Sequence, residues 1–306
     1  MDRVQKGSMV TAKRRETITA LLFALPWFIG FSVFLLYPLI ASVYYSFCDY
    51  SVLRPPVFIG IANYSDLWHD EVFWKTLQNT SIYTIFALPC GLFVALSLAM
   101  LLNTKVRGLT IYRTIFFVPS LVPQVSLAVL WLWLFNGEHG IINYVLNFFL
   151  WPLHMKGPNW LSDPFWSKPA LVLLGVWGVG NAMVIYLAGL QDVPQALYEA
   201  ADLDGATWWA KTWHVTLPML SPVILFNLIM GIIGTLQVFT VPYVMFPGGS
   251  PARSTYFYTM YLFDNAFIYH KMGYACAMGW IMFLIILVLT LFSLKMSERH
   301  VYYGGS

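Results

Sequence analysis

The chain has 306 residues, of which 59% are hydrophobic and only 10% are charged, and its mean hydropathy is +0.67. Soluble domains carry about 25% charged residues, so this composition excludes an ordinary water-facing surface. The net charge of +3 is not concentrated in a basic cluster that would indicate a nucleic acid partner. The composition therefore predicts a protein whose main solvent is the lipid bilayer.

Six apolar runs are long enough to cross a hydrocarbon core of about 30 Å as helices of roughly 20 residues. None of these runs contains Asp, Glu, Lys, Arg or His. No strand-type alternation is present, so helices must satisfy the backbone polar groups inside the bilayer. We expect an all-α polytopic membrane protein. Its predicted spans are residues 19–43, 80–102, 115–135, 169–190, 223–243 and 274–294.

The domain organisation is expected to be simple, with a cytoplasmic N-terminal segment, 1–18, followed by one transmembrane domain, 19–306. The first apolar run has about 25 residues, which exceeds the apolar core of a signal peptide, so we expect an uncleaved span. The apolar piece 141–151 is too short to cross a bilayer. We expect it to lie at the membrane interface or to pack on the bundle.

The distribution of Lys and Arg predicts the orientation of the chain. If the N-terminus is cytoplasmic, eleven of these residues lie inside and six lie outside, as the positive-inside rule requires. Both termini are then cytoplasmic, and residues 191–222 form a cytoplasmic loop between the fourth and fifth spans. The inside residues are Arg3, Lys6, Lys13, Arg14, Arg15, Lys105, Arg107, Arg113, Lys211, Lys295 and Arg299. The outside residues are Arg54, Lys75, Lys156, Lys168, Arg253 and Lys271.

The expected spans lack the ionisable side chains that proton-driven carriers and voltage sensors place at membrane depth. The chain also lacks the phosphate-binding loop G-x-x-x-x-G-K-[ST], the zincin motif and the G-x-S-x-G elbow. Cys48, Cys90 and Cys276 are odd in number and scattered, which favours neither a disulfide framework nor a zinc site. A pump with this sequence must take its energy from another subunit that docks on the cytoplasmic side.

The loop 191–222 is unusually charged for this chain and contains a pattern that predicts a short helix. We expect Asp192 to cap its N-terminus, with Gln195 completing a capping box, and Gly205 to end it in a left-handed conformation. A second short helix with three interface-type tryptophans should then follow, and Pro218 is expected to break it before the fifth span.

The predicted helix has two different faces. One face carries small side chains that allow a partner to approach closely, and it consists of Leu197, Ala200, Ala201 and Asp204. Glu199 and Asp202 project from another face and are able to meet basic groups. From the residues alone, the loop is either a docking surface or a solvated connection whose acids keep it in water.

Residues 199–218 resemble the EAA loop of binding-protein-dependent ABC importer permeases. The pattern is Glu-Ala-Ala, three residues, Gly, nine residues, an aliphatic residue, any residue and Leu-Pro, and here Val215 takes the aliphatic position where Ile is commoner. Other stretches are similar to the sugar branch of that family, which includes maltose, lactose, trehalose and glycerol-phosphate permeases, and to the first of its two permeases. These stretches are residues 34–50, 58–68, 77–84, 111–135 and 246–255.

The resemblance implies a type I permease fold in a bacterial or archaeal cytoplasmic (inner) membrane. It implies a second, non-identical permease, two ATPase subunits that bind ATP and Mg, and an extracytoplasmic solute-binding protein. This chain would be non-catalytic, bind no cofactor itself, and insert its loop into a groove on the ATPase. The coupling residues implied are Glu199, Ala200, Ala201, Asp202, Asp204, Gly205, Leu217 and Pro218.

A solute path without ionisable residues must be lined by amides, hydroxyls, aromatics and kinks, and Pro119 and Pro123 would free carbonyls where they line a cavity. The residues alone give Ser120, Gln124, Ser126, Trp177, Asn181, Asn227, Thr235 and Gln237 as candidates. The resemblance to maltose-type permeases implies Ser120, Gln124, Trp177, Gly178, Asn181, Gly234 and Thr235, although Asn181 stands where that relative has an aromatic residue. For any single one of these polar side chains, the alternative of bridging two helices is the favoured interpretation.

The resemblance implies a disaccharide or oligosaccharide as the solute. A glycerol-phosphate or another small polar solute is the alternative. A more remote hypothesis is an integral membrane enzyme acting on lipid or glycan, but its acids would all lie in one loop with only His214 as a nearby base. Those acids are Asp192, Glu199, Asp202 and Asp204.

Overall fold

The computed structural model describes residues 2–104, 108–153 and 156–297. Three residues used to predict the orientation, Lys105, Arg107 and Arg299, lie outside the described residues, as does the tail after Ser297. The described chain is almost entirely helical, which confirms the all-α expectation. Its strands are limited to a two-residue antiparallel pair, β1 Cys48–Asp49 and β2 Val57–Phe58.

The chain divides into two compact units. The first comprises residues 1–67 and 265–280, and the second comprises residues 68–264 and 281–306. The first unit contains α1 Asp2–Phe31, a π-helical turn Ser32–Leu36, α2 Tyr37–Ser46 and the hairpin. It also contains most of α3 Ala62–His69 and the first part of α15 Met272–Ser297.

The first unit is held together where α15 begins. Its backbone N–H at Gly273 donates to Tyr50 O at 3.0 Å, and an added Cβ at Gly273 would lie 2.0 Å from Cys48 O. Glycine is therefore required for this close approach. Farther along α15, Trp280 Nε1 donates to Ser42 Oγ at 3.2 Å.

The second unit is built on α4 Glu71–Leu102, which packs against α8 Ser167–Trp177, α9 Gly180–Gln191 and α12 Leu217–Leu236. Asp70 caps α4 by accepting a hydrogen bond from Val72 N at 2.8 Å. The second unit also contains several shorter helices. They are α5 Leu109–Phe117, α6 Gln124–Leu134, α7 Ile141–Leu150, α10 Gln195–Leu203, α11 Trp208–Lys211, α13 Thr240–Met245 and α14 Tyr258–Phe263.

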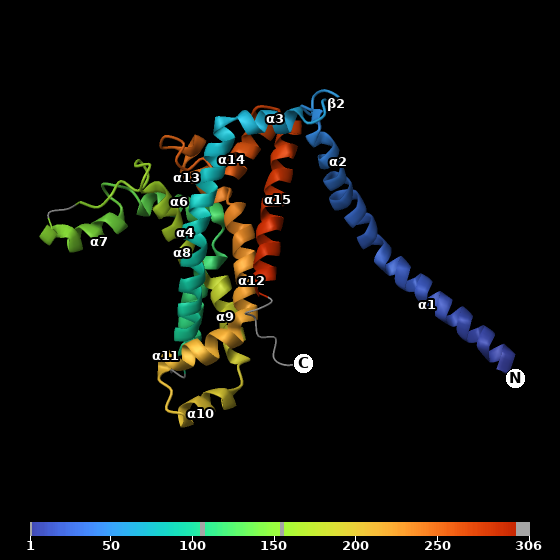
Figure 1. Ribbon diagram of the computed structural model, residues 1–306, viewed down its shortest axis with the longest axis horizontal. Helices are drawn as coiled ribbons and strands as arrows, with labels where there is room; N and C mark the ends of the chain where they lie inside the picture. Colours follow the sequence, from blue (N-terminus) through green and yellow to red (C-terminus); the bar gives the residue numbers. More distant parts are fainter. Residues whose placement is uncertain (1, 105–107, 154–155, 298–306) are drawn as a thin grey trace. The chain divides into compact units, whose positions relative to one another are not determined.

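Within the second unit, α10 and α11 lie at one end of the bundle of α4, α9 and α12, and α14 lies toward its other end (Figure 1). One buried core surrounds Trp131, Phe135 and Phe257. A second surrounds Ala95, Tyr186 and Leu220 where α4, α9 and α12 meet. The small residues of α4 in this second core allow the three helices to pack closely.

The described residues contain four helical segments long and apolar enough to cross a membrane, or up to six if two bent pairs each count as one span. The four segments are Glu16–Ser46, Glu71–Leu102, Trp208–Met245 and Met272–Ser297. The six expected spans are therefore present only if the bent pairs over 115–135 and 169–190 each count as one span. The first bent pair turns by 99° between Leu121 and Gln124, and the second turns by 46° between Trp177 and Gly180.

Proline and glycine account for the positions of the two bends. Pro123 has no N–H to continue the helix and drives the preceding residue to an extended conformation, and Val122 has φ −71° and ψ 128°. Gly178 ends α8 with φ −90° and ψ 14°, and a glycine at this point lowers the cost of leaving the helix.

Asn79 ties α4 to the loop that precedes α14. Its side chain is buried, and its Nδ2 donates to Arg253 O at 2.8 Å and to Tyr256 O at 3.0 Å. A buried amide of this kind requires hydrogen-bond partners, and these two carbonyls supply them.

We predict that Asn79→Ala lowers the stability of the folded chain by about 1–3 kcal/mol, because it removes both hydrogen bonds that tie α4 to this loop. Thermal unfolding in detergent measures this effect. Gln78→Ala, one residue earlier and exposed, is the control and should leave the Tm unchanged. Equal Tm values for the two variants would contradict the role given to Asn79.

Candidate functional site

The helix α10 ends as the sequence predicts. Gly205 has φ +72°, its N–H donates to Asp202 O at 3.1 Å, and Ala206 N donates to Ala201 O at 2.9 Å. These two bonds form a Schellman motif, in which glycine supplies the left-handed residue. The stop is therefore built into the backbone and does not need a partner.

The start of α10 differs from the prediction. Pro194 precedes the first helical residue, no side chain caps the helix, and Asp192 instead ends α9. The predicted capping box of Asp192 and Gln195 is therefore wrong. Pro194, with φ −58° and ψ 127°, sets the entry angle of the chain by its own fixed φ.

The helix α10 is exposed to an unusual degree. None of its residues is buried, and Leu203 at its end is 91% exposed. Among the predicted coupling residues, Glu199, Ala200, Asp202, Asp204 and Gly205 are exposed, and Ala201 is half-buried. The small-residue face is thus open to a partner.

Two contacts hold α10 to the rest of the second unit. The Tyr198 hydroxyl shares a hydrogen bond of 3.0 Å with Thr216 Oγ1, and Lys211 Nζ lies 2.5 Å from Asp202 Oδ1. Asp202 is therefore engaged within the chain, whereas Glu199 and Asp204 are exposed and form no ion pair within the described residues. The sequence analysis missed Tyr198 and Thr216, because they are 18 positions apart and belong to no periodic pattern.

Pro218 does not break the chain as predicted. Thr207 caps α11 by accepting a 3.4 Å hydrogen bond from Ala210 N, and a π-helical turn, Thr212–Thr216, leads directly into α12. Leu217 N donates to Thr212 O across this wider turn. A proline ring clashes with the carbonyl four residues earlier in an α-helix, and the π-turn removes that clash, so the helical segment continues through α12 to Leu236.

The exposed loop encloses a pocket of about 210 Å³ against the ends of α4 and α9. Tyr198, Lys211 and Thr216 line it from one side, and Asn103 lines it from the end of α4. A small pocket with both polar and apolar lining residues therefore lies between the predicted docking helix and the ends of α4 and α9.

The two bent spans meet at Gly180, the first residue of α9. An added Cβ there would lie 2.9 Å from Phe116 O, 3.0 Å from Phe117 Cα and 3.0 Å from Ser120 Oγ. Near the same bends, Trp177 packs edge-on against Trp131, with ring centroids 5.9 Å apart. The structure thus brings Ser120, Trp177 and Gly178 of the predicted path into one region.

The other predicted path residues have different surroundings. Gln124 begins α6, Asn181 lies in the first turn of α9, and Gln237 ends α12, and all three are exposed. Thr235 Oγ1 donates within its own helix to Gly231 O at 2.8 Å. Gly234 has no atom within 4 Å of an added Cβ.

Two further polar candidates from the residue pattern, Asn227 and Ser126, also differ in their surroundings. Asn227 is buried and donates to Val223 O within α12 at 2.9 Å, so it serves its own helix. Ser126 is exposed on α6. Within the described part of the chain, no group of three or more His, Cys, Asp or Glu side chains is arranged to hold a metal ion.

Interrupted spans that meet inside a helix bundle are the arrangement at the binding sites of membrane transporters. The geometry therefore defines a polytopic membrane protein of the transporter class. Residues 87–301 match the family described as binding-protein-dependent transport system inner membrane component. The chain belongs to this family.

Two relatives illustrate the kinship. The probable ABC transporter permease protein YesP of Bacillus subtilis (strain 168) is 38% identical over 293 residues, covering 95% of this chain and 94% of YesP. The lactose transport system permease protein LacF of Rhizobium radiobacter is 35% identical over 289 residues, covering 92% and 95% of the two chains. The resemblance to carbohydrate importer permeases is thereby confirmed, and the chain is a non-catalytic membrane subunit.

A solved structure has the same fold. It is a bacterial alginate ABC transporter in complex with a periplasmic protein bound to an alginate pentasaccharide. One of its chains is 25% identical, with a TM-score of 0.80, and the match covers 96% of this chain and 98% of that chain. The multi-pass membrane architecture follows from this likeness together with the family.

We predict that Gly180→Val lowers stability by about 1–3 kcal/mol through overpacking, because the new side chain would force α9 away from the bend at Ser120. A fall in the Tm of the full-length chain in detergent measures it. Gly234→Ala adds a methyl group where nothing lies within 4 Å, so it is the matched control. An unchanged Tm for Gly180→Val would show that the two bends are not packed together.

Proposed function

We propose that the chain is one of two non-identical permease subunits of an ATP-driven importer, and that α10 couples it to an ATPase subunit. The observation that carries this proposal is the exposure of α10, a helix with no buried residue whose end is nevertheless fixed by a Schellman motif. A solvated connection would not need a defined small-residue face. A docking helix does, because its partner must recognise a fixed shape.

Force on α10 would travel through its two attachments. The Tyr198–Thr216 and Asp202–Lys211 contacts join α10 to α11 and to the π-turn. The helical segment then continues without a break into the bundle. Displacement of α10 by a closing ATPase would therefore shift α12 as a lever.

The bends near Gly180 and Ser120 are the proposed solute path. Alternating access would occlude the solute between this chain and the second permease as the ATPases close. The proposed path residues are Ser120, Gln124, Trp177, Gly178, Asn181, Gly234, Thr235 and Gln237. They are neutral, and they combine amides and hydroxyls with an aromatic face, which suits the hydroxyls and apolar ring faces of a sugar.

We infer a neutral disaccharide or oligosaccharide as cargo. The name of LacF, which cites lactose, supports this class. The alginate transporter handles an acidic polysaccharide, but the proposed path of this chain contains no Lys or Arg to pair with a carboxylate. The same absence weighs against a glycerol-phosphate, which remains the alternative cargo.

The proposed complex contains the second permease, two ATPase subunits that hold ATP and Mg, and an extracytoplasmic solute-binding protein. The alginate transporter was solved with such a periplasmic protein, which supports that partner. We place the complex in a bacterial or archaeal cytoplasmic membrane, with both termini and the loop 191–222 on the cytoplasmic side, as the Lys and Arg distribution predicts.

Glu199→Lys and Gly205→Val should uncouple ATP hydrolysis from uptake. The first reverses a charge at the docking face. The second forces a β-branched residue into a left-handed conformation at a cost of about 1–2 kcal/mol. We expect at least a tenfold loss of uptake, equivalent to about 1.4 kcal/mol of docking free energy, with basal ATPase activity retained in reconstituted vesicles.

The control for these variants is Glu138→Lys, which reverses an exposed acid in the loop between α6 and α7. It should transport normally, and all three variants should insert in the membrane at equal levels. Full uptake by both Glu199→Lys and Gly205→Val would contradict the coupling role.

Gln124→Leu and Asn181→Leu should weaken uptake while the complex still assembles. Loss of one neutral hydrogen bond to the solute costs about 0.5–1.5 kcal/mol, so we expect the apparent KM for uptake to rise about two- to tenfold. Gln78→Leu, at an exposed position of α4, is the control. Unchanged transport kinetics in both path variants would assign these amides to helix bridging.

A further inference from the structure

A long apolar groove lies between α4 and α8, away from the docking helix, and it extends along α8 to Val176. It has a volume of about 800 Å³ and is lined from α4 by Ile82, Phe86 and Cys90, among others. Phe86 and Phe93 are 61% and 72% exposed. The groove is therefore open along the side of the second unit.

One end of this groove is polar. Lys168, in the first turn of α8, is its only charged lining residue, and its side chain is half-buried. Lys75 on α4 lies close enough to Lys168 to interact electrostatically with it. No ion pair joins either lysine to an acid within the described residues.

The nearest acidic residue in sequence is already engaged. Asp163 Oδ1 accepts a hydrogen bond from Phe165 N at 2.8 Å. Lys168, with Lys75 nearby, thus makes this end of the groove positive, and no Asp or Glu of the described chain lines the groove. A bound anion at that end would relieve the repulsion between the two lysines.

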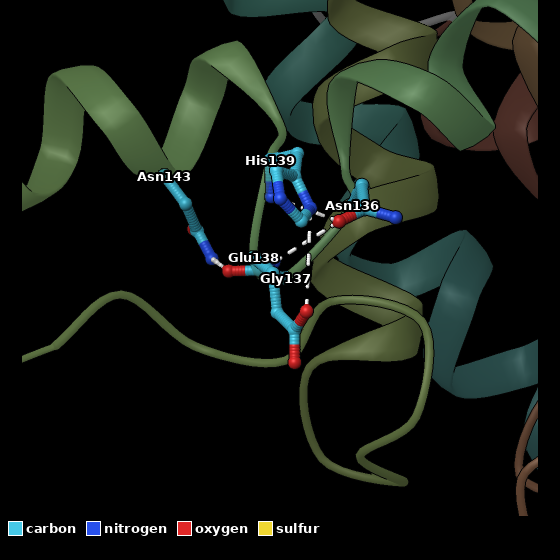
Figure 2. A network of polar contacts seen from close by, with 5 residues as sticks. All are labelled: Asn136, Gly137, Glu138, His139 and Asn143. Atoms are coloured by element: carbon cyan, nitrogen blue, oxygen red, sulfur yellow. Dashed lines mark hydrogen bonds and ion pairs between the residues drawn. The ribbon is translucent and has the colours of Figure 1, made fainter.

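The aromatic wall beside Lys168 is rigid. Trp160 is buried, its Nε1 donates to Asn143 Oδ1 at 2.7 Å, and its ring packs edge-on against Trp166 at 5.4 Å. Asn143 is itself fixed, because its Nδ2 donates to Gly137 O at 2.9 Å and to Pro158 O at 3.1 Å. Figure 2 shows this amide directed at the Gly137 carbonyl, in the turn that also holds Asn136.

The length of the groove fits a single leaflet. On α4 it extends from Ile82 to Val94, which is about 18 Å at the helical rise, and half of a hydrocarbon core is about 15 Å. If a transmembrane helix of another subunit occupied the groove, we would expect the groove to extend across the whole hydrocarbon core of about 30 Å. Trp and Lys at one end and an apolar channel at the other match the interface and the interior of a leaflet.

From this geometry we propose that the groove between α4 and α8 is a binding site for one anionic phospholipid. The headgroup phosphate lies against Lys168, with Lys75 nearby and Trp160 as a side wall. One acyl chain lies along Phe86 and Cys90 toward Val176. None of the described residues that line the groove belongs to the proposed solute path or to the docking helix.

Native mass spectrometry of the delipidated complex, titrated with phosphatidylglycerol or phosphatidylcholine, tests the site. The wild type should bind the first phosphatidylglycerol about fivefold more tightly than phosphatidylcholine, a factor equivalent to about 1 kcal/mol per lysine at an anionic headgroup. Lys168→Gln should abolish this preference. Lys156→Gln, which removes an exposed lysine that does not line the groove, should retain it.

Two further measurements test whether binding requires the apolar groove in addition to the charge of Lys168. Leu173→Trp fills the channel while leaving Lys168 in place, and it should weaken phosphatidylglycerol binding at least fivefold. Glycerol phosphate, which has the headgroup but no acyl chain, should not displace the lipid.

Three outcomes would overturn the proposal. A lipid preference that survives Lys168→Gln would place the lipid elsewhere. Displacement by glycerol phosphate would indicate a bare anion site. Absence of any preference in the wild-type complex would indicate that another subunit covers the groove.

Discussion

A peptide group inside a bilayer finds no water, so every departure from a helix must be compensated by hydrogen bonds from the protein itself. The second unit meets this requirement at its interruptions. At the first bend, Ser120 Oγ donates to Phe117 O at 2.7 Å, and after α12 the Thr259 hydroxyl donates to Val238 O. At both places a side-chain hydroxyl supplies a hydrogen bond to the irregular backbone. The same polar groups are those that a neutral sugar needs in its path.

At the end of the second unit that carries α10, the backbone does not depend on the protein for all its hydrogen bonds. Here water is available, so α10 stands exposed and is held by few contacts. A neutral hydrogen bond contributes about 0.5–1.5 kcal/mol and an exposed ion pair about 0.2–1 kcal/mol. The Tyr198 and Asp202 contacts therefore hold the helix in place but leave it free to reorient under a modest load. The lever that follows it, by contrast, is one continuous helical segment from Trp208 to Leu236.

The sequence predicted those features that depend on local chemistry. Hydropathy located the helical spans, and Gly205 was correctly placed as a left-handed stop because few other residues adopt φ +72°. Pro123 indicated a kink, but the angle of 99° was not predictable, since it depends on how α6 packs against α13. Pro218 was misjudged because a π-turn, which carries no sequence signature, removes the clash. Asp192 was misjudged because Pro194 fixes the entry to α10 without a cap.

Contacts between distant segments were beyond the reach of sequence patterns. The Gly180 contact with Ser120 joins two spans, and only the assembled bundle shows why a side chain cannot be accommodated there. The surroundings of α8, which ends at the second bend, are likewise visible only in the assembled bundle. Val176 lines the groove, and the next residue, Trp177, packs on Trp131 beside the proposed path. Because a half-helix moves as a rigid body, a lipid that fixes one face of α8 also limits the motion of Trp177, so the lipid and the solute act on the same element.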